Sequence, residues 1–239
     1  MDWGAARVVA RRDETPRVRS IVFDCPTWEG HMAGQHVDIR LTAEDGYQAQ
    51  RSYSIASAPE DDHLMLTVER LQDGEVSPYL TDDLAPGDQL EMRGPIGRYF
   101  VWESGTGRPL LMIGGGSGVV PFRAMLRHRS AQQVDAPARL LYSSRTIQDV
   151  IYRDELTEFE DSRGVEVRLA LTRSQPEGWD GFARRVDAAI LSEVAWAPPD
   201  RPHIYVCGPT GFVETVANCL VDLGHDPNSI RTERFGPTG

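Results

Sequence analysis

The chain of 239 residues contains no lysine, because all 25 of its basic residues are arginine. This excludes a Schiff base, the phosphate-binding loop of nucleotide hydrolases and a lysine general base. The three cysteines, Cys25, Cys207 and Cys219, lie far apart without a C-x-x-C pair. That spacing excludes a four-cysteine iron–sulfur cluster and a zinc ribbon. The six histidines show no ligand spacing either, so we expect no metal.

Long apolar runs and a strong positive charge are also missing from the sequence. No run approaches the roughly 20 apolar residues that span a membrane, and the first residues lack the pattern of a secretory signal. We therefore expect no membrane span and a cytoplasmic location. The net charge of −11 argues against a nucleic-acid partner. Residues 1–103 hold 10 arginines and 19 acids (−9), whereas residues 104–239 hold 15 and 17 (−2), which favours an anionic ligand in the second half.

The first hundred residues alternate short apolar runs with turn clusters, a pattern typical of an antiparallel barrel or sandwich. A helix with Ser77 as its N-cap and Pro78 at its first position is expected over residues 77–84. A further aromatic strand is expected over 99–102. The six principal strands are predicted at residues 6–10, 18–23, 36–41, 51–56, 63–69 and 89–93.

From about residue 108 the pattern changes to continuous apolar runs separated by helical segments, which predicts a doubly wound parallel sheet. We therefore expect two domains, at residues 1–103 and 108–239, joined by a linker. Five parallel strands are predicted at residues 109–113, 139–142, 166–171, 203–207 and 230–233. The helices are predicted at residues 121–129, 152–161, 183–194 and 209–223.

A glycine-rich turn, Gly114-Gly115-Gly116-Ser117-Gly118, follows the first strand of the second domain and precedes its first helix. Glycines at this place let phosphate oxygens reach bare N–H groups at the start of the helix. The strict G-x-G-x-x-G pattern fails, because its last glycine would fall on Val119. The sequence favours a dinucleotide turn of another subclass over a merely flexible loop.

Cys207-Gly208-Pro209 and Thr210 stand where the fourth parallel strand ends and a helix begins. Ligands of open parallel sheets bind at this edge. The thiol could touch the reactive ring of a cofactor, or it could be a small packing residue.

Ser144 and Arg145 follow the second parallel strand, where an adenosine ribose would lie in a dinucleotide fold. Hydroxyls and arginine there favour a ribose 2′-phosphate, whereas an acid would favour a free 2′-hydroxyl. Arg173 and Arg184 could converge on the same phosphate. The alternative is that each is a solvated surface arginine.

Arg51, Ser52, Tyr53 and Ser54 form a short predicted strand in the first domain. The arginine offers a charged fork for a pyrophosphate, the tyrosine a ring for stacking, and Ser54 a small hydroxyl donor. An exposed strand facing water is the alternative. Near the end of the chain, Glu233 and Phe235 are two residues apart. This carboxylate and aromatic ring could cover a planar ring, or they could belong to a frayed terminus.

Four motifs together resemble the ferredoxin–NADP+ reductase family over nearly the whole chain. Its R-x-Y-S, G-x-x-S, G-x-G-x-x-P-F and C-G-P motifs are matched in that order. The matching residues are Arg51, Tyr53 and Ser54; Gly74 and Ser77; Gly114 and Gly116, or Gly116 and Gly118, with Pro121 and Phe122; and Cys207, Gly208 and Pro209.

The resemblance implies a six-stranded Greek-key barrel that binds FAD and a sheet that binds NADPH, with NADH possible. It implies that Ser54, Cys207 and Glu233 surround the site of hydride transfer. The implied flavin-binding residues are Arg51, Ser52, Tyr53, Ser54, Thr67, Val68, Gly74, Val76, Ser77 and Phe235. The implied nucleotide-binding residues are Gly114, Gly116, Ser117, Gly118, Ser144, Arg145, Arg173, Arg184, Cys207, Gly208, Pro209 and Thr210.

The implied function is hydride transfer from NADPH or NADH to FAD, with electrons passed on to a separate acceptor such as ferredoxin, flavodoxin or another metalloprotein. Two alternatives stay open. One is a diaphorase-like reductase of free flavin or quinones, and the other is a non-enzymatic redox-sensing subunit that binds nucleotide.

Overall fold

The computed structural model describes residues 2–162 and 164–236. The chain forms two compact units. One comprises Met1–Glu103 with Arg123–Ala131, and the other comprises Ser104–Phe122 with Gln132–Gly239. This division differs from the expected domains at residues 123–131. The boundaries 1–103 and 108–239 therefore stay a prediction.

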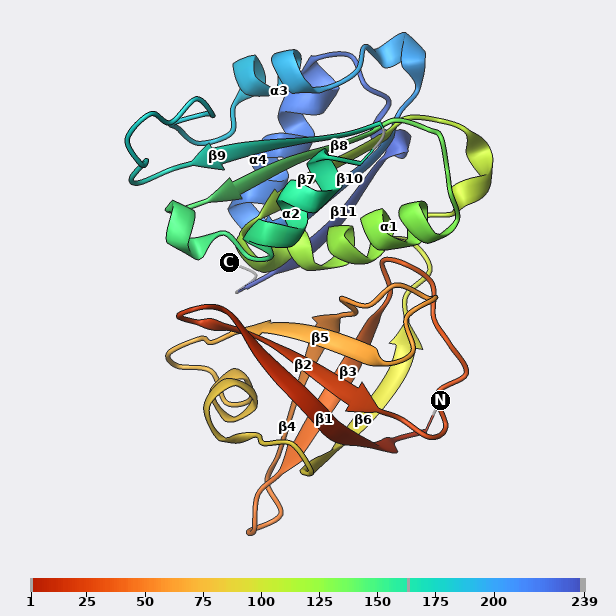
Figure 1. The fold of residues 1–239 in the computed structure, drawn as a ribbon, viewed down its shortest axis with the longest axis vertical. Coiled ribbons are helices and arrows are strands. Elements are labelled where there is room, and N and C mark those ends of the chain that lie inside the picture. Colours follow the sequence, from red (N-terminus) through yellow and green to blue (C-terminus); the bar gives the residue numbers. More distant parts are fainter. Residues whose placement is uncertain (1, 163, 237–239) are drawn as a thin grey trace. The chain divides into compact units, whose positions relative to one another are not determined.

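The first unit is built on a six-stranded antiparallel sheet in the order β4-β3-β6-β1-β2-β5 (Figure 1). A bridge between Ile55 and Leu66 joins the end of β4 to β5 and closes the sheet into a barrel. The predicted barrel is thereby confirmed. Its strands are β1 Gly4–Thr15, β2 Val18–Asp24, β3 His36–Thr42, β4 Gln48–Ser54, β5 Leu64–Glu69 and β6 Gln89–Ile96.

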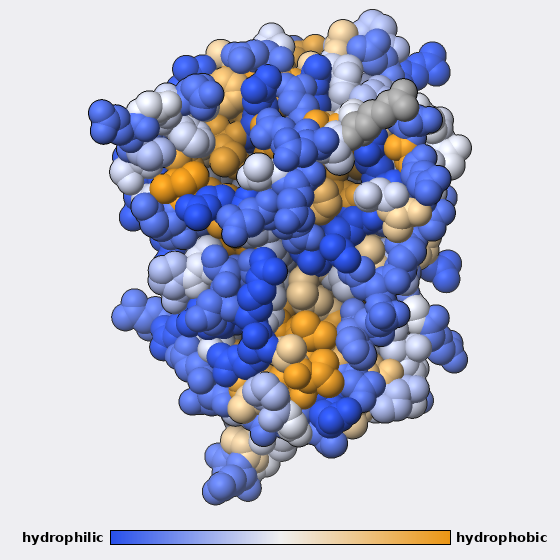
Figure 2. Space-filling model, viewed as in Figure 1, coloured by the Kyte–Doolittle hydropathy of each residue, from blue (hydrophilic) through white to orange (hydrophobic). Residues whose placement is uncertain are grey.

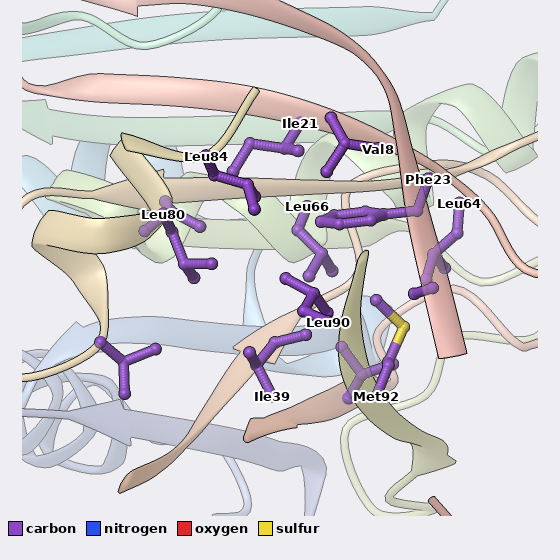
Figure 3. Close-up of a cluster of buried hydrophobic side chains, with 14 of the residues drawn as sticks. Val8, Ile21, Phe23, Ile39, Leu64, Leu66, Leu80, Leu84, Leu90 and Met92 are labelled. Carbon is purple, nitrogen blue, oxygen red and sulfur yellow. The ribbon is translucent and has the colours of Figure 1, made fainter. Parts of the chain in front are cut away.

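Inward-facing apolar side chains from the strands and from one helical turn meet in a single cluster inside the barrel (Figure 3). Leu80 of that turn and Leu84 directly after it are fully buried with it. The turn, Tyr79–Asp83, is a π-helix, in which the N–H of Leu84 bonds the carbonyl of Tyr79. The expectation that Ser77 caps a helix is wrong, because the Ser77 hydroxyl instead accepts a hydrogen bond from the N–H of Leu71.

Residues 99–102 form a turn and an extended segment without a partner strand, so the expected aromatic strand is wrong. Phe100, Val101 and Trp102 are nevertheless buried. The N–H of Trp102 bonds the carbonyl of Ala33, and this is how the segment is anchored. Its apolar composition reflects burial rather than strand pairing.

The second unit contains five parallel strands in the order β11-β10-β7-β8-β9. Helices cover both faces of the sheet, with α2 on one face and α3 and α4 on the other (Figure 1). The predicted doubly wound sheet is confirmed. Helix α1 Val120–Ala131 follows β7, but only its first three residues belong to this unit. The other elements of the unit are β7 Leu110–Gly115, β8 Ala138–Ser144, α2 Arg153–Glu160, β9 Val165–Leu171, α3 Ala188–Val194, β10 His203–Pro209, α4 Thr210–Asp222 and β11 Ile230–Phe235.

Helix α3 begins five residues later than the sequence pattern predicts, at Ala188 instead of position 183. The carboxylate of Asp187 caps it by accepting a hydrogen bond from the N–H of Ile190. The preceding residues pair with the sheet, because the N–H of Leu171 bonds the carbonyl of Phe182. The segment before α3 therefore runs along the outer edge of β9.

The strand order reverses at β7, which has β8 on one side and β10 on the other. The turns that follow β7 and β10 therefore leave the sheet at the same edge, next to each other. Such a reversal is where open α/β sheets bind their ligands.

The surface is mostly hydrophilic on the face shown in Figure 2, with hydrophobic patches bounded by polar residues. Within residues 2–162 and 164–236, no helix is long and apolar enough to cross a membrane. The same residues contain no group of three or more His, Cys, Asp or Glu side chains that could hold a metal ion.

Candidate functional site

The glycine turn after β7 lies directly against the end of β10. A Cβ atom added at Gly118 would stand 2.2 Å from the carbonyl oxygen of Cys207, so only glycine fits there. Gly116, with a φ of +56°, opens the short 3-10 helix Gly116–Val119, which contains Ser117. Of the two possible alignments of the glycine motif, the one with Gly116 and Gly118 therefore has the stricter geometric need for glycine.

Gly114, at the end of β7, is in contact with the first turn of α1. A Cβ atom there would stand 3.3 Å from the ring of Phe122. The aromatic residue at the end of the glycine motif thus packs back onto the strand and fixes the direction in which the helix leaves it.

Cys207 and Glu233 lie side by side on the neighbouring strands β10 and β11. The thiol sulfur is 4.0 Å from Oε2 of Glu233. Cys207 is buried, and this burial together with the negative charge of Glu233 raises its pKa well above the usual value. The side chain is therefore a neutral thiol at physiological pH and not a nucleophilic thiolate.

The segment after Cys207 is shaped by Phe212, whose ring lies against both the glycine turn and Gly208. A Cβ atom at Gly115 or Gly208 would come within 2.9 Å or 2.8 Å of that ring. Pro209 ends β10 and Thr210 begins α4. The buried Oγ1 of Thr210 has no hydrogen-bond partner among the residues that the structure describes. The glycine turn exposes backbone N–H groups at the same edge as this hydroxyl. Both could bind a nucleotide, which would supply the hydrogen-bond partner that Thr210 lacks.

The ends of β8 and β9 continue side by side beyond the regular strands. The N–H of Thr172 bonds the carbonyl of Ser144, and the N–H of Arg173 bonds that of Arg145. Both arginine side chains are exposed. Arg184 follows on the adjacent edge segment but pairs with Asp187 at 2.9 Å. The structure therefore brings Arg145 and Arg173 together and gives Arg184 a partner of its own.

In the barrel, alternation along β4 sends Arg51 and Tyr53 to one face and Ser52 to the other. Tyr53 packs against the barrel core, and burial raises the pKa of its phenol. Arg51 is half exposed and contacts Glu75 at 2.6 Å. The Ser52 hydroxyl donates to the buried carboxylate of Asp38 at 2.6 Å, so it already has a partner within the barrel.

Ser54 ends β4, half-buried and opposite His36 of β3. Burial lowers the pKa of His36, which keeps this imidazole neutral beside the serine. Phe235 ends β11 in register with Pro209 and is 37% exposed.

The remaining residues expected near a flavin either bury their side chains in the barrel or, at Gly74, have none. Val68 and Val76 are buried in the barrel core, and the Thr67 hydroxyl pairs with that of Ser20 at 2.8 Å. A Cβ atom at Gly74 would stand 2.8 Å from the Ser77 oxygen, so glycine is needed to close this loop. Any ligand contact from these positions therefore comes from peptide groups.

Two residues that sequence reasoning missed, Tyr47 and Glu75, lie beside Arg51. The Tyr47 hydroxyl donates to Oε1 of Glu75 at 2.5 Å, while Arg51 bonds Oε2. The only signal in the sequence is that Glu75 falls between Gly74 and Ser77 of the G-x-x-S motif.

Each half of the chain matches a known protein family. Residues 5–101 match an oxidoreductase FAD-binding domain, and residues 112–218 match an oxidoreductase NAD-binding domain. The first match covers nearly the whole barrel, and the second covers the parallel sheet from within β7 through β10 and most of α4, but not β11.

Individual relatives agree with this assignment. The chain is 34% identical to ferredoxin–NADP reductase B of Sorangium cellulosum over 96% of both chains. It is 33% identical to the glycine betaine monooxygenase reductase subunit of Chromohalobacter salexigens over 97% of its own length, but spans only 64% of that protein.

Among solved structures, the FAD/NAD-binding domain of nitric oxide dioxygenase from Vibrio cholerae is similar, with a TM-score of 0.88 and 26% identity. The match covers 99% of this chain and 100% of that one. The chain therefore belongs to the ferredoxin–NADP reductase family of FAD-dependent NAD(P)H oxidoreductases.

Proposed function

We propose that this protein transfers a hydride from NADPH to FAD and passes the electrons to a separate protein acceptor. The observation that carries this proposal is the contact between the glycine turn and Cys207 at the edge where the strand order reverses. It places a turn of bare backbone directly beside the Cys207–Glu233 pair.

The flavin would be held in the barrel by the Arg51 guanidinium on its diphosphate and by the Tyr53 ring against its isoalloxazine. The N–H groups of residues 75–77 would add backbone donors. Bound flavin supplies the ability to accept a hydride and to release electrons one at a time. Tyr53 is suited to stacking because packing against the barrel core fixes its ring.

The Cys207–Glu233 pair would orient the nicotinamide and control protons next to it. The raised pKa of Cys207 keeps the thiol protonated, so no second negative charge develops beside Glu233. A protonated thiol offers a soft, uncharged surface to the nicotinamide ring, while Glu233 remains partly accessible to exchange protons. The Ser54 hydroxyl, at the end of β4, would donate to the flavin in the barrel. Positioning of the two rings would supply most of the rate.

The preference for NADPH over NADH would come from Arg145 and Arg173. Their guanidinium groups start from adjacent strand ends, and no ion pair is found for either within the described residues. A ribose 2′-phosphate between them would receive charge-assisted hydrogen bonds from both. Arg184 could join only by giving up Asp187.

The acceptor is proposed to be a ferredoxin or another metalloprotein, or a flavodoxin. Support comes from relatives named as ferredoxin–NADP reductase and as the reductase subunit or component of monooxygenases. The expected cytoplasmic location stays a prediction.

The visible spectrum of the purified full chain tests the proposed function. We expect a flavin spectrum, either as purified or after adding FAD, that bleaches when NADPH is added without oxygen. A protein that takes up no FAD, or one whose flavin NADPH leaves oxidised, would contradict the proposal.

Replacing Arg145 by alanine is expected to raise the KM for NADPH roughly 10-fold and to change that for NADH much less. The reason is the loss of one charge-assisted hydrogen bond to the 2′-phosphate. Steady-state kinetics with both nucleotides measures this. Arg168→Ala, an exposed arginine on β9 that pairs with Glu166, is the control and should affect neither nucleotide. Equal effects of Arg145→Ala on NADPH and NADH would refute the 2′-phosphate assignment.

Gly118→Ala should weaken NADP+ binding and cost about 1–3 kcal/mol of stability, because the added methyl group meets the Cys207 carbonyl. Gly211→Ala is the matched control, since a Cβ atom there has no neighbour within 4 Å. Calorimetric titration with NADP+ and urea unfolding report the two effects. If both glycine variants behave like the wild type, the turn does not depend on that close approach.

A further inference from the structure

The side chain of Glu75 forms an ion pair with Arg51, the residue that is expected to bind the flavin diphosphate. Its Oε2 lies 2.6 Å from Nη2 of Arg51, and its Oε1 accepts the hydroxyl of Tyr47 at 2.5 Å. Both carboxylate oxygens are therefore engaged by groups from the β3–β4 hairpin. These contacts join segments that are 24 and 28 residues apart in the chain.

The backbone that carries Glu75 is fixed. On its C-terminal side Val76 and Ser77 are buried, and on its N-terminal side Gly74 donates its N–H to the carbonyl of Leu71. The Ser77 oxygen accepts the N–H of Leu71 and closes the loop. Glu75 thus projects from a loop whose backbone is held on both sides of it, so a ligand can displace its side chain without breaking those contacts.

The contact between Glu75 and Arg51 is open to exchange. The side chains of Arg51 and Glu75 are 52% and 46% exposed. Hydrogen bonds from Tyr47 and Arg51 lower the pKa of the Glu75 carboxyl, so it is ionised at neutral pH. A carboxylate and a diphosphate are bound by the same guanidinium geometry.

We propose that Glu75 is an internal competitor for Arg51 and that it sets the affinity of this protein for FAD. The flavin diphosphate displaces the carboxylate from the guanidinium, and the carboxylate then remains as a negative charge beside the phosphates. This inference rests on the proposed FAD site and adds to it a residue that weakens binding.

Removing the charge of Glu75 while keeping its size is the direct test. Glu75→Gln can still accept the Tyr47 hydroxyl, but it no longer holds Arg51 by charge. We expect the Kd for FAD to fall about 2- to 10-fold, in the range that exposed ion pairs contribute. The measurement is a fluorescence titration of FAD into the deflavinated full chain, with thermal melting to confirm that each variant is folded.

Glu91→Gln is the matched control. Glu91 lies on the same barrel, 44% exposed, and contacts Arg40 at 2.6 Å, so the control removes the same charge from a similar ion pair. Its Kd for FAD should equal that of the wild type. The wild-type Kd should also rise less steeply with salt than that of Glu75→Gln, because in the wild type Arg51 exchanges one anion for another, whereas in the variant it gains an ion pair that salt screens.

Three results would overturn the assignment. If Glu75→Gln binds FAD as the wild type does or more weakly, Glu75 positions Arg51 rather than competing for it. If Glu75→Gln and Glu91→Gln tighten binding equally, the effect is one of overall charge. If neither the wild type nor the variants bind FAD, the proposed FAD site fails as well.

Discussion

The close approach of the turn after β7 to the end of β10 is the constraint on which the proposed nucleotide site depends. At position 118 there is no room for a side-chain atom, because the carbonyl oxygen of Cys207 occupies that space. The contact lies where the strand order reverses, the place at which parallel sheets of this kind bind ligands. It gathers the glycine turn, the Cys207–Glu233 pair and the start of α4 at one edge.

In the barrel, burial decides which groups remain available to a ligand. The side chains of Val68 and Val76 fill the core, and the hydroxyls of Ser52 and Ser77 already have partners. The proposed flavin contacts are therefore the Tyr53 ring, the Ser54 hydroxyl, peptide groups and the Arg51 guanidinium, which contacts Glu75. Such a site would recognise flavin by one charged contact and by its shape, more than by a set of polar side chains.

Hydrophobic periodicity predicted the strands of both sheets, because an inward face that must be buried leaves few alternative registers. It failed at residues 99–102, where Phe100 and Trp102 are buried without strand pairing. Motif spacing located Arg51 and Cys207, whose positions are fixed by the strands that carry them. It could not predict Glu75 as the partner of Arg51, because that contact depends on how a loop 24 residues away folds back onto β4.

Hydrogen–deuterium exchange of the full chain, with and without each cofactor, tests the central claim most directly. Backbone amides exchange more slowly where a ligand covers them or stabilises their hydrogen bonds. The account predicts that FAD slows exchange in residues 51–54 and 74–77. It predicts that NADP+ slows exchange in residues 114–118 and 207–210, at the carboxyl edge of the parallel sheet. Protection by NADP+ at the opposite edge, or protection by FAD that leaves both barrel segments unchanged, would contradict it.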